Sequence, residues 1–171
     1  DEIPSIQDNS EQIISPETAY QIISMMEGAV QRGTGRKLKN LKLNLAGKTG
    51  TTNKNMDAWF LGFTSKLVIG VYVGFDEPKS LGRYETGAKT AMPIFKTFIK
   101  NAVKKVDARP FKVAKNINMM VIDLKTGKKA DFGSSKTIIE VFKKNTIENI
   151  NLKDNDDSKH KFKKNNILKF Y

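Results

Sequence analysis

The chain has 171 residues, and its 30 Lys and Arg against 18 Asp and Glu give it a formal charge of +12. It has no cysteine and one histidine, His160, which excludes disulfides, cysteine nucleophiles and multi-histidine metal sites, and we expect no cofactor or metal. The charge favours an anionic partner, but not nucleic acid, because the basic residues are scattered and lack interleaved aromatic residues.

The first 14 residues indicate a linker or the end of an element that begins upstream. A helix is predicted next, because Ser15 suits an N-cap, Pro16 suits the first helical position, and apolar residues follow at helical spacing as far as Val30. Gly33 then provides a stop signal.

Three strands are predicted after this helix, at residues 45–52, 58–63 and 67–75, with turns at 52–55 and 64–66 between them. Such short connections predict an antiparallel meander.

Residues 76–91 predict a loop, and Pro93 predicts the start of a second helix whose apolar stripe should pack across the sheet. We therefore assign residues 15–106 to one domain portion. Residues 107–144 form a small extension with a short strand at 119–124, and residues 145–171 form a Lys- and Asn-rich tail that is expected to be disordered.

The tripeptide Lys-Thr-Gly occurs twice, at residues 48–50 and 125–127. The second copy follows a short apolar strand and precedes two lysines, which predicts a turn in which Gly127 adopts positive φ. The first copy lies within a predicted strand, where Lys48 can assist proton transfer and the hydroxyls of Thr49 and Thr51 can bind a carboxylate. Taken alone, this tripeptide favours an ordinary strand that merely begins with a solvated lysine.

The neighbouring motifs resolve this ambiguity, because together they resemble the C-terminal part of the transpeptidase domain of class A penicillin-binding proteins. The resemblance covers residues 12–144, and its motifs are SPETAY (15–20), VQRGTG (30–35), LAGKTGTT (45–52), DAWF (57–60), VYVGFD (71–76), LGR (81–83), ETG (85–87) and AMPIF (91–95).

The resemblance implies an α/β (α+β) fold, namely a partial penicillin-recognising serine-enzyme (β-lactamase/transpeptidase-like) fold. An antiparallel meander would be covered by a C-terminal helix, and the N-terminal portion with the nucleophile helix would be missing. Lys48 would serve the proton relay, and Thr49 and Thr51 would bind the terminal carboxylate of a D-Ala-D-Ala stem peptide or of a β-lactam. Thr51 N–H would contribute to the oxyanion hole, and Gly50 would leave room for the substrate.

The family's nucleophilic serine is absent from the positions where this resemblance would require it. The one Ser-x-x-Lys begins at Ser158 in the expected tail, where nothing would fix its lysine or exclude water, so we interpret it as a chance match. No Ser-x-Asn element occurs. The chain is therefore expected to provide the Lys-Thr-Gly strand of a peptidoglycan D,D-transpeptidase and to be inactive alone.

Two alternatives stay open: a β-lactamase or D,D-carboxypeptidase relative, and a non-enzymatic basic module that binds cell-wall polymer or a partner synthase. No apolar run is long enough to span a membrane, so a place on the outer face of the cytoplasmic membrane or in the periplasm would depend on an anchor outside this chain. An N-terminal partner or other wall synthases are the expected protein partners.

Strands and a helix supplied from upstream would normally complete the sheet, so we expect an open apolar face and an unpaired edge. The isolated chain should then be marginally stable, aggregation-prone or dependent on a partner. A cooperative thermal transition of a monomer would count against this expectation.

Overall fold

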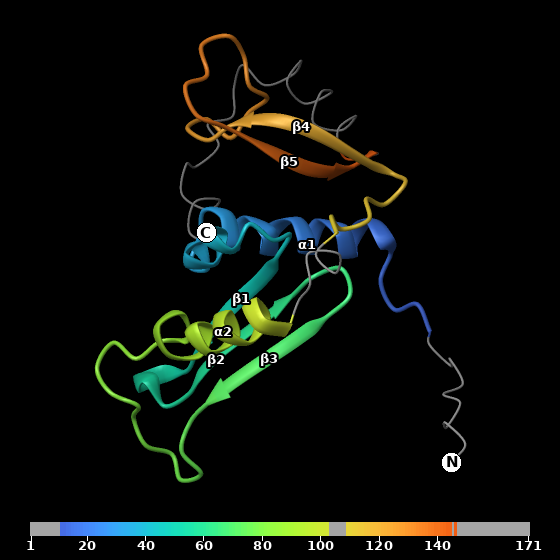
Figure 1. The fold of residues 1–171 in the computed structure, drawn as a ribbon. Helices are drawn as coiled ribbons and strands as arrows, with labels where there is room; N and C mark the ends of the chain where they lie inside the picture. The colour runs from blue at the N-terminus through green and yellow to red at the C-terminus, as the bar shows by residue number, and fades with distance from the viewer. Residues whose placement is uncertain (1–10, 103–108, 145, 147–171) are drawn as a thin grey trace, which may run out of the picture.

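The computed structural model describes residues 11–102, 109–144 and 146 (Figure 1). A three-stranded antiparallel sheet lies at the centre, one helix covers a face of it, and a second helix separates the sheet from a two-stranded hairpin. The elements are α1 (Pro16–Gln31), the 3₁₀ helices η1 (Arg36–Leu41) and η2 (Asn53–Asn55), β1 (Ala46–Thr51), β2 (Ala58–Phe63), β3 (Val68–Val73), the π-helical turn η3 (Gly87–Ala91), α2 (Met92–Ala102), β4 (Ile117–Asp123) and β5 (Thr137–Lys143).

The first helix begins and ends as the sequence predicts. The Ser15 hydroxyl accepts a hydrogen bond from Thr18 N at 3.2 Å, and Pro16 occupies the first helical position. The helix ends at Gln31, two residues before Gly33, whose N–H caps the carbonyl of Ala29 at 3.1 Å.

The predicted meander is confirmed, with strand order β1-β2-β3 and antiparallel pairing throughout. The predicted bounds of the middle strand are correct, and the outer two strands are shorter than predicted.

Helix α2 covers one face of the sheet, also as predicted. Phe95 is fully buried against Phe60, with ring centroids 4.8 Å apart. This close approach requires the glycine at position 62, where a Cβ would lie 2.5 Å from the Phe95 ring. The core therefore forms where α2 meets β2.

The opposite face of the sheet is open over much of its area in the described part of the chain, except at one end, where Phe111 packs against Phe63 with ring centroids 5.6 Å apart. Trp59 and Leu61 are each 46% exposed, and two residues of β3 are more exposed still, namely Tyr72, which pairs with Trp59, and Val68 at the start of the strand. Strand β3 pairs only with β2 among the described residues, so its outer edge is also unpaired. These two features agree with the sheet expected from the sequence.

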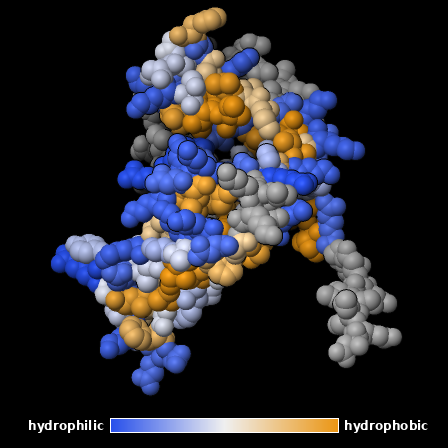
Figure 2. All heavy atoms as spheres, in the orientation of Figure 1, coloured by the Kyte–Doolittle hydropathy of each residue, from blue (hydrophilic) through white to orange (hydrophobic). Residues whose placement is uncertain are grey.

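A hairpin of β4 and β5 packs on α1, on the side away from the sheet (Figure 1). Lys143 Nζ donates to the Thr18 hydroxyl at 2.7 Å, and Gln21 Nε2 donates to Val141 O at 3.3 Å. The outer surface of the hairpin is partly apolar, with Met119, Val121 and Ile139 about half exposed or more (Figure 2).

The structure corrects several details of the predicted elements. The segment 76–91 is not all loop, because η3 occupies its end and runs directly into α2, which begins at Met92 instead of Pro93. Strand β5 and helix η1 were not predicted. The predicted tail lies, except for Thr146, outside the described residues.

No helix in the described ranges has the length and apolar character that a membrane crossing requires.

Substituting the two phenylalanines of α2 will test the position of the core. Phe95→Ala should lower the free energy of unfolding by about 3–5 kcal/mol, because it empties a fully buried site. Phe98→Ala removes a side chain that is 53% exposed and should cost less than about 1 kcal/mol. Urea denaturation followed by circular dichroism measures both, and equal losses would contradict this packing.

Candidate functional site

The residues of the first Lys-Thr-Gly lie on β1 and alternate between the faces of the sheet. Thr49 and Thr51 pair with Phe60 and Ala58, so they lie on the face that α2 covers. Lys48 pairs with Leu61 and lies on the open face. The predicted site residues are therefore divided between the two faces.

The outer edge of β1 brings these residues together. Thr52 N donates to Asp57 O at 3.1 Å, so the N–H of Thr52 points toward β2. Because successive N–H groups along a strand point in opposite directions, the N–H groups of Thr49 and Thr51 point away from β2. Thr49 O points the same way, and Lys48 Nζ reaches around to donate to it at 3.1 Å. The Lys48 ammonium, the Thr49 carbonyl and the Thr51 N–H therefore lie along this edge, and both threonines belong to the edge strand.

Thr34 is a neighbour of this edge to which the sequence had assigned no role. Its hydroxyl oxygen lies 3.2 Å from that of Thr49, and either atom can be the donor. The loop carrying Thr34 folds tightly onto α1, since a Cβ at Gly33 would lie 2.9 Å from Ala29 Cα. The Gly-Thr-Gly pattern was the available sequence signal.

Gly87 is a second neighbour that sequence reasoning missed. Its N–H donates to the Thr51 hydroxyl at 3.0 Å. A Cβ at Gly87 would lie 2.2 Å from Trp59 O and 2.6 Å from Gly50 O, so only glycine lets η3 lie directly on the strand backbone. Turn η3 therefore forms one wall beside the end of β1.

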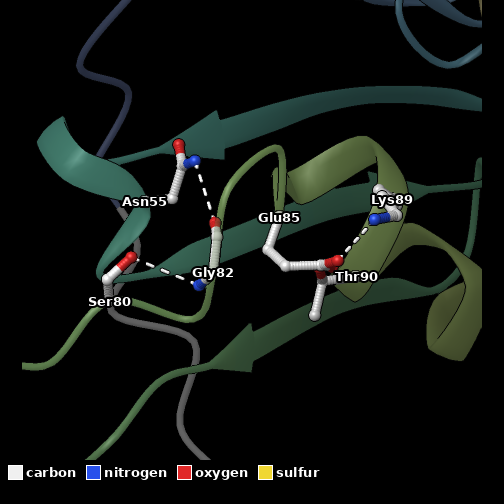
Figure 3. A network of polar contacts seen from close by, with 6 residues as sticks. All are labelled: Asn55, Ser80, Gly82, Glu85, Lys89 and Thr90. Carbon is white, nitrogen blue, oxygen red and sulfur yellow. Dashed lines mark hydrogen bonds and ion pairs between the residues drawn. The ribbon is translucent and has the colours of Figure 1, made fainter.

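The loop that leads to η3 is fastened to the turn after β1 (Figure 3). Asn55 Nδ2 donates to Gly82 O at 3.2 Å, and the Ser80 hydroxyl accepts from Gly82 N at 3.2 Å while donating to Lys54 O at 2.9 Å. Both Lys54 and Asn55 have positive φ, a conformation that these bonds help to hold.

Glu85 braces the same loop against η3 (Figure 3). Its carboxylate accepts hydrogen bonds from the ammonium of Lys89 and, at 2.6 Å, from the hydroxyl of Thr90. These bonds, first that from Lys89, hold the pKa of Glu85 below its ordinary value of 4.5.

The second Lys-Thr-Gly forms a turn, as predicted. Gly127 has a φ of +71°, and the Asp123 carboxylate accepts from the N–H groups of Lys125 and Thr126. Ser158 lies outside the described residues. Within the described ranges, no group of three or more acidic or histidine side chains is placed to hold a metal.

A strand with Lys-Thr-Gly at the edge of an antiparallel sheet, covered by a C-terminal helix, defines part of a penicillin-recognising fold. A family model described as the penicillin binding protein transpeptidase domain matches residues 5–100, more than half of the chain. The chain belongs to this family.

Several relatives are penicillin-binding proteins 1A. That of Rickettsia conorii is 46% identical over 142 residues, covering 81% of this chain and 18% of the relative. That of Pseudomonas aeruginosa is 42% identical over 135 residues, covering 78% and 16%. The crystal structure of penicillin-binding protein 1A from Haemophilus influenzae matches with a TM-score of 0.66 and 35% identity, over 75% of this chain and 20% of that one. The chain thus spans about a fifth of the length of these proteins.

Two glycine substitutions will test how closely η3 lies on the strand. Gly87→Ala should destabilise the chain by about 1–3 kcal/mol and shift the amide resonance of Thr51, because the added methyl group meets backbone oxygens. Gly70→Ala is the matched control, since its Cβ would meet only Leu61 Cδ1 at 3.5 Å. A Gly87→Ala variant as stable as Gly70→Ala would exclude the contact.

The brace at Glu85 predicts a response to acid. Because the folded pKa of Glu85 is lowered, its stabilising contribution is complete above the unfolded value of 4.5 and is lost as the pH falls through the folded value. The amide resonances of Lys89 and Thr90 should therefore shift below pH 4.5. Glu85→Gln should abolish this titration, and an unchanged titration in that variant would assign it to another group.

Proposed function

We propose that the chain contributes the substrate-binding strand of a peptidoglycan D,D-transpeptidase. The observation that carries this proposal is that Lys48, Thr49 and Thr51 belong to β1, an edge strand that pairs only with β2 among the described residues. Membership of the transpeptidase family and the names of its relatives support it.

A D-Ala-D-Ala stem peptide would lie along this edge as an added strand. Gly50 would present no side chain to the substrate, while the hydroxyls of Thr49 and Thr51 would donate hydrogen bonds to the terminal carboxylate. The charge of Lys48 would attract that carboxylate and assist proton transfer. Thr51 N–H, directed outward, would stabilise the oxyanion.

The nucleophilic serine would come from outside this chain. It would attack the carbonyl between the two D-Ala residues and expel the terminal one, after which an amine of a neighbouring stem peptide would attack the acyl-enzyme. A β-lactam would acylate the same serine.

The nucleophile-bearing part would be the chain's principal partner and would cover the face that exposes Trp59 and Leu61. In this arrangement residues 15–106 complete the transpeptidase domain and residues 107–144 form an extension to it. The site would lie on the outer face of the cytoplasmic membrane, held there by an anchor outside this chain.

A chimera will test this function. In penicillin-binding protein 1A of Rickettsia conorii, this chain replaces the aligned segment, and labelling by fluorescent penicillin is followed in time. The chimera should be labelled. Lys48→Ala should slow labelling by about 10²–10⁴-fold, the usual contribution of a proton-transferring group.

Lys125→Ala is the matched control, because it alters the same tripeptide in the turn and should leave labelling unchanged. The chain alone should not be labelled. A chimera that folds but is not labelled would contradict the proposed function, and a stable adduct on the isolated chain would place a nucleophile within the 171 residues.

A further inference from the structure

The β4–β5 hairpin is joined to the end of α1 by an ion pair. Arg32 Nη2 donates to Glu140 Oε1 at 2.9 Å, with the two side chains 34% and 19% exposed. Arg32 is the residue that follows the helix, and Glu140 lies at the middle of β5. The pair thus connects the hairpin to the loop after α1.

Arg32 lies folded back over α1, where a glycine makes room for it. A Cβ at Gly28 would lie 2.8 Å from Arg32 Nη2, and Arg32 N–H caps Gly28 O at 2.9 Å. The backbone and the guanidinium of Arg32 are therefore both held against the last turn of the helix. If the Glu140 carboxylate shifts, the Arg32 guanidinium therefore has little freedom to follow it without moving the backbone of Arg32 as well.

The same loop reaches the candidate site two residues later. Gly33 N and Gly35 N both donate to Ala29 O, at 3.1 and 2.9 Å, and Thr34 lies between these two anchors. Its hydroxyl meets that of Thr49. A continuous series of contacts therefore runs from β5 through Arg32 and Thr34 to the substrate-binding strand.

We propose that Glu140 and Arg32 are positioning residues for the transpeptidase site, acting through Thr34 on Thr49. This inference rests on the proposed function of that strand. When the Thr34 hydroxyl donates to Thr49 Oγ1, the one proton of the Thr49 hydroxyl is directed to an outside acceptor, the carboxylate of the stem peptide. In this arrangement the β4–β5 hairpin holds the loop that carries Thr34 in place, and the ion pair between Glu140 and Arg32 sets the orientation of the Thr34 hydroxyl toward Thr49.

The first test needs no ligand. In the ¹⁵N-labelled chain, Glu140→Ala and Arg32→Ala should each shift the amide resonances of Thr34 and Thr49, and Glu140→Gln, which keeps an acceptor oxygen at the same length, should shift them less. Lys143→Ala is the matched control, because it removes a contact of the same strand with the other end of α1. It should leave Thr34 and Thr49 unchanged.

The second test measures labelling of the chimera by fluorescent penicillin. Glu140→Ala should reduce the second-order rate by about threefold to fivefold, as expected for loss of a partly exposed ion pair. Thr34→Val should reduce it at least as much, and the double variant should be no slower than Thr34→Val, because both act on one hydroxyl.

The two tests distinguish a failure of the positioning role of Glu140 and Arg32 from a failure of the proposed transpeptidase function. Unlabelled chimera would contradict the proposed function, whereas the resonances of Thr34 and Thr49 would still decide the positioning role. Unchanged resonances in Glu140→Ala, an equal shift in Lys143→Ala, or additive rate losses for Glu140→Ala and Thr34→Val would each overturn the positioning role.

Discussion

The contact between Phe95 and Phe60 is the constraint on which the rest of this structure depends. It fixes α2 on the sheet, and Gly62 allows the helix to come close enough for the two rings to meet. Because η3 runs into α2 without a break, the same contact sets Gly87 on the backbone of β1. A change in the packing of Phe95 on Phe60 would therefore also change how η3 lies beside the candidate site.

The elements with strong local signals could be predicted from sequence. Helix α1 has a capping serine, a proline at its first position and a long apolar stripe, while the sheet has two short turns between strands. Strand β5 has no such punctuation, because the tract from Thr137 mixes consecutive and alternating apolar residues. Turn η3 depends on contacts that Gly87 makes with distant strands, and local sequence carries no sign of them.

The same division applies to the candidate site. Lys48, Thr49 and Thr51 could be chosen from sequence because a family motif marks them, and their shared edge follows from strand geometry. Their neighbours could not. Thr34 and Gly87 lie 15 and 36 residues from the hydroxyls they meet, so the Gly-Thr-Gly pattern could mark Thr34 as unusual, but the packing of α1 and α2 was needed to show which hydroxyls the two residues meet. The contacts that Thr34 and Gly87 make with these hydroxyls decide where each hydroxyl proton points, and a sequence motif does not specify that direction.

The open face and unpaired edge of the sheet have a colloidal consequence. Two copies of the chain could pair through such edges, yet each carries a formal charge of +12, and this repulsion opposes their approach. Salt shortens the range of the repulsion to about 8 Å at physiological strength, while the attraction between apolar faces persists. Electrostatic repulsion thus opposes association of two copies through the open apolar face of the sheet. An acidic polymer bound to the chain would neutralise its charge and remove this repulsion.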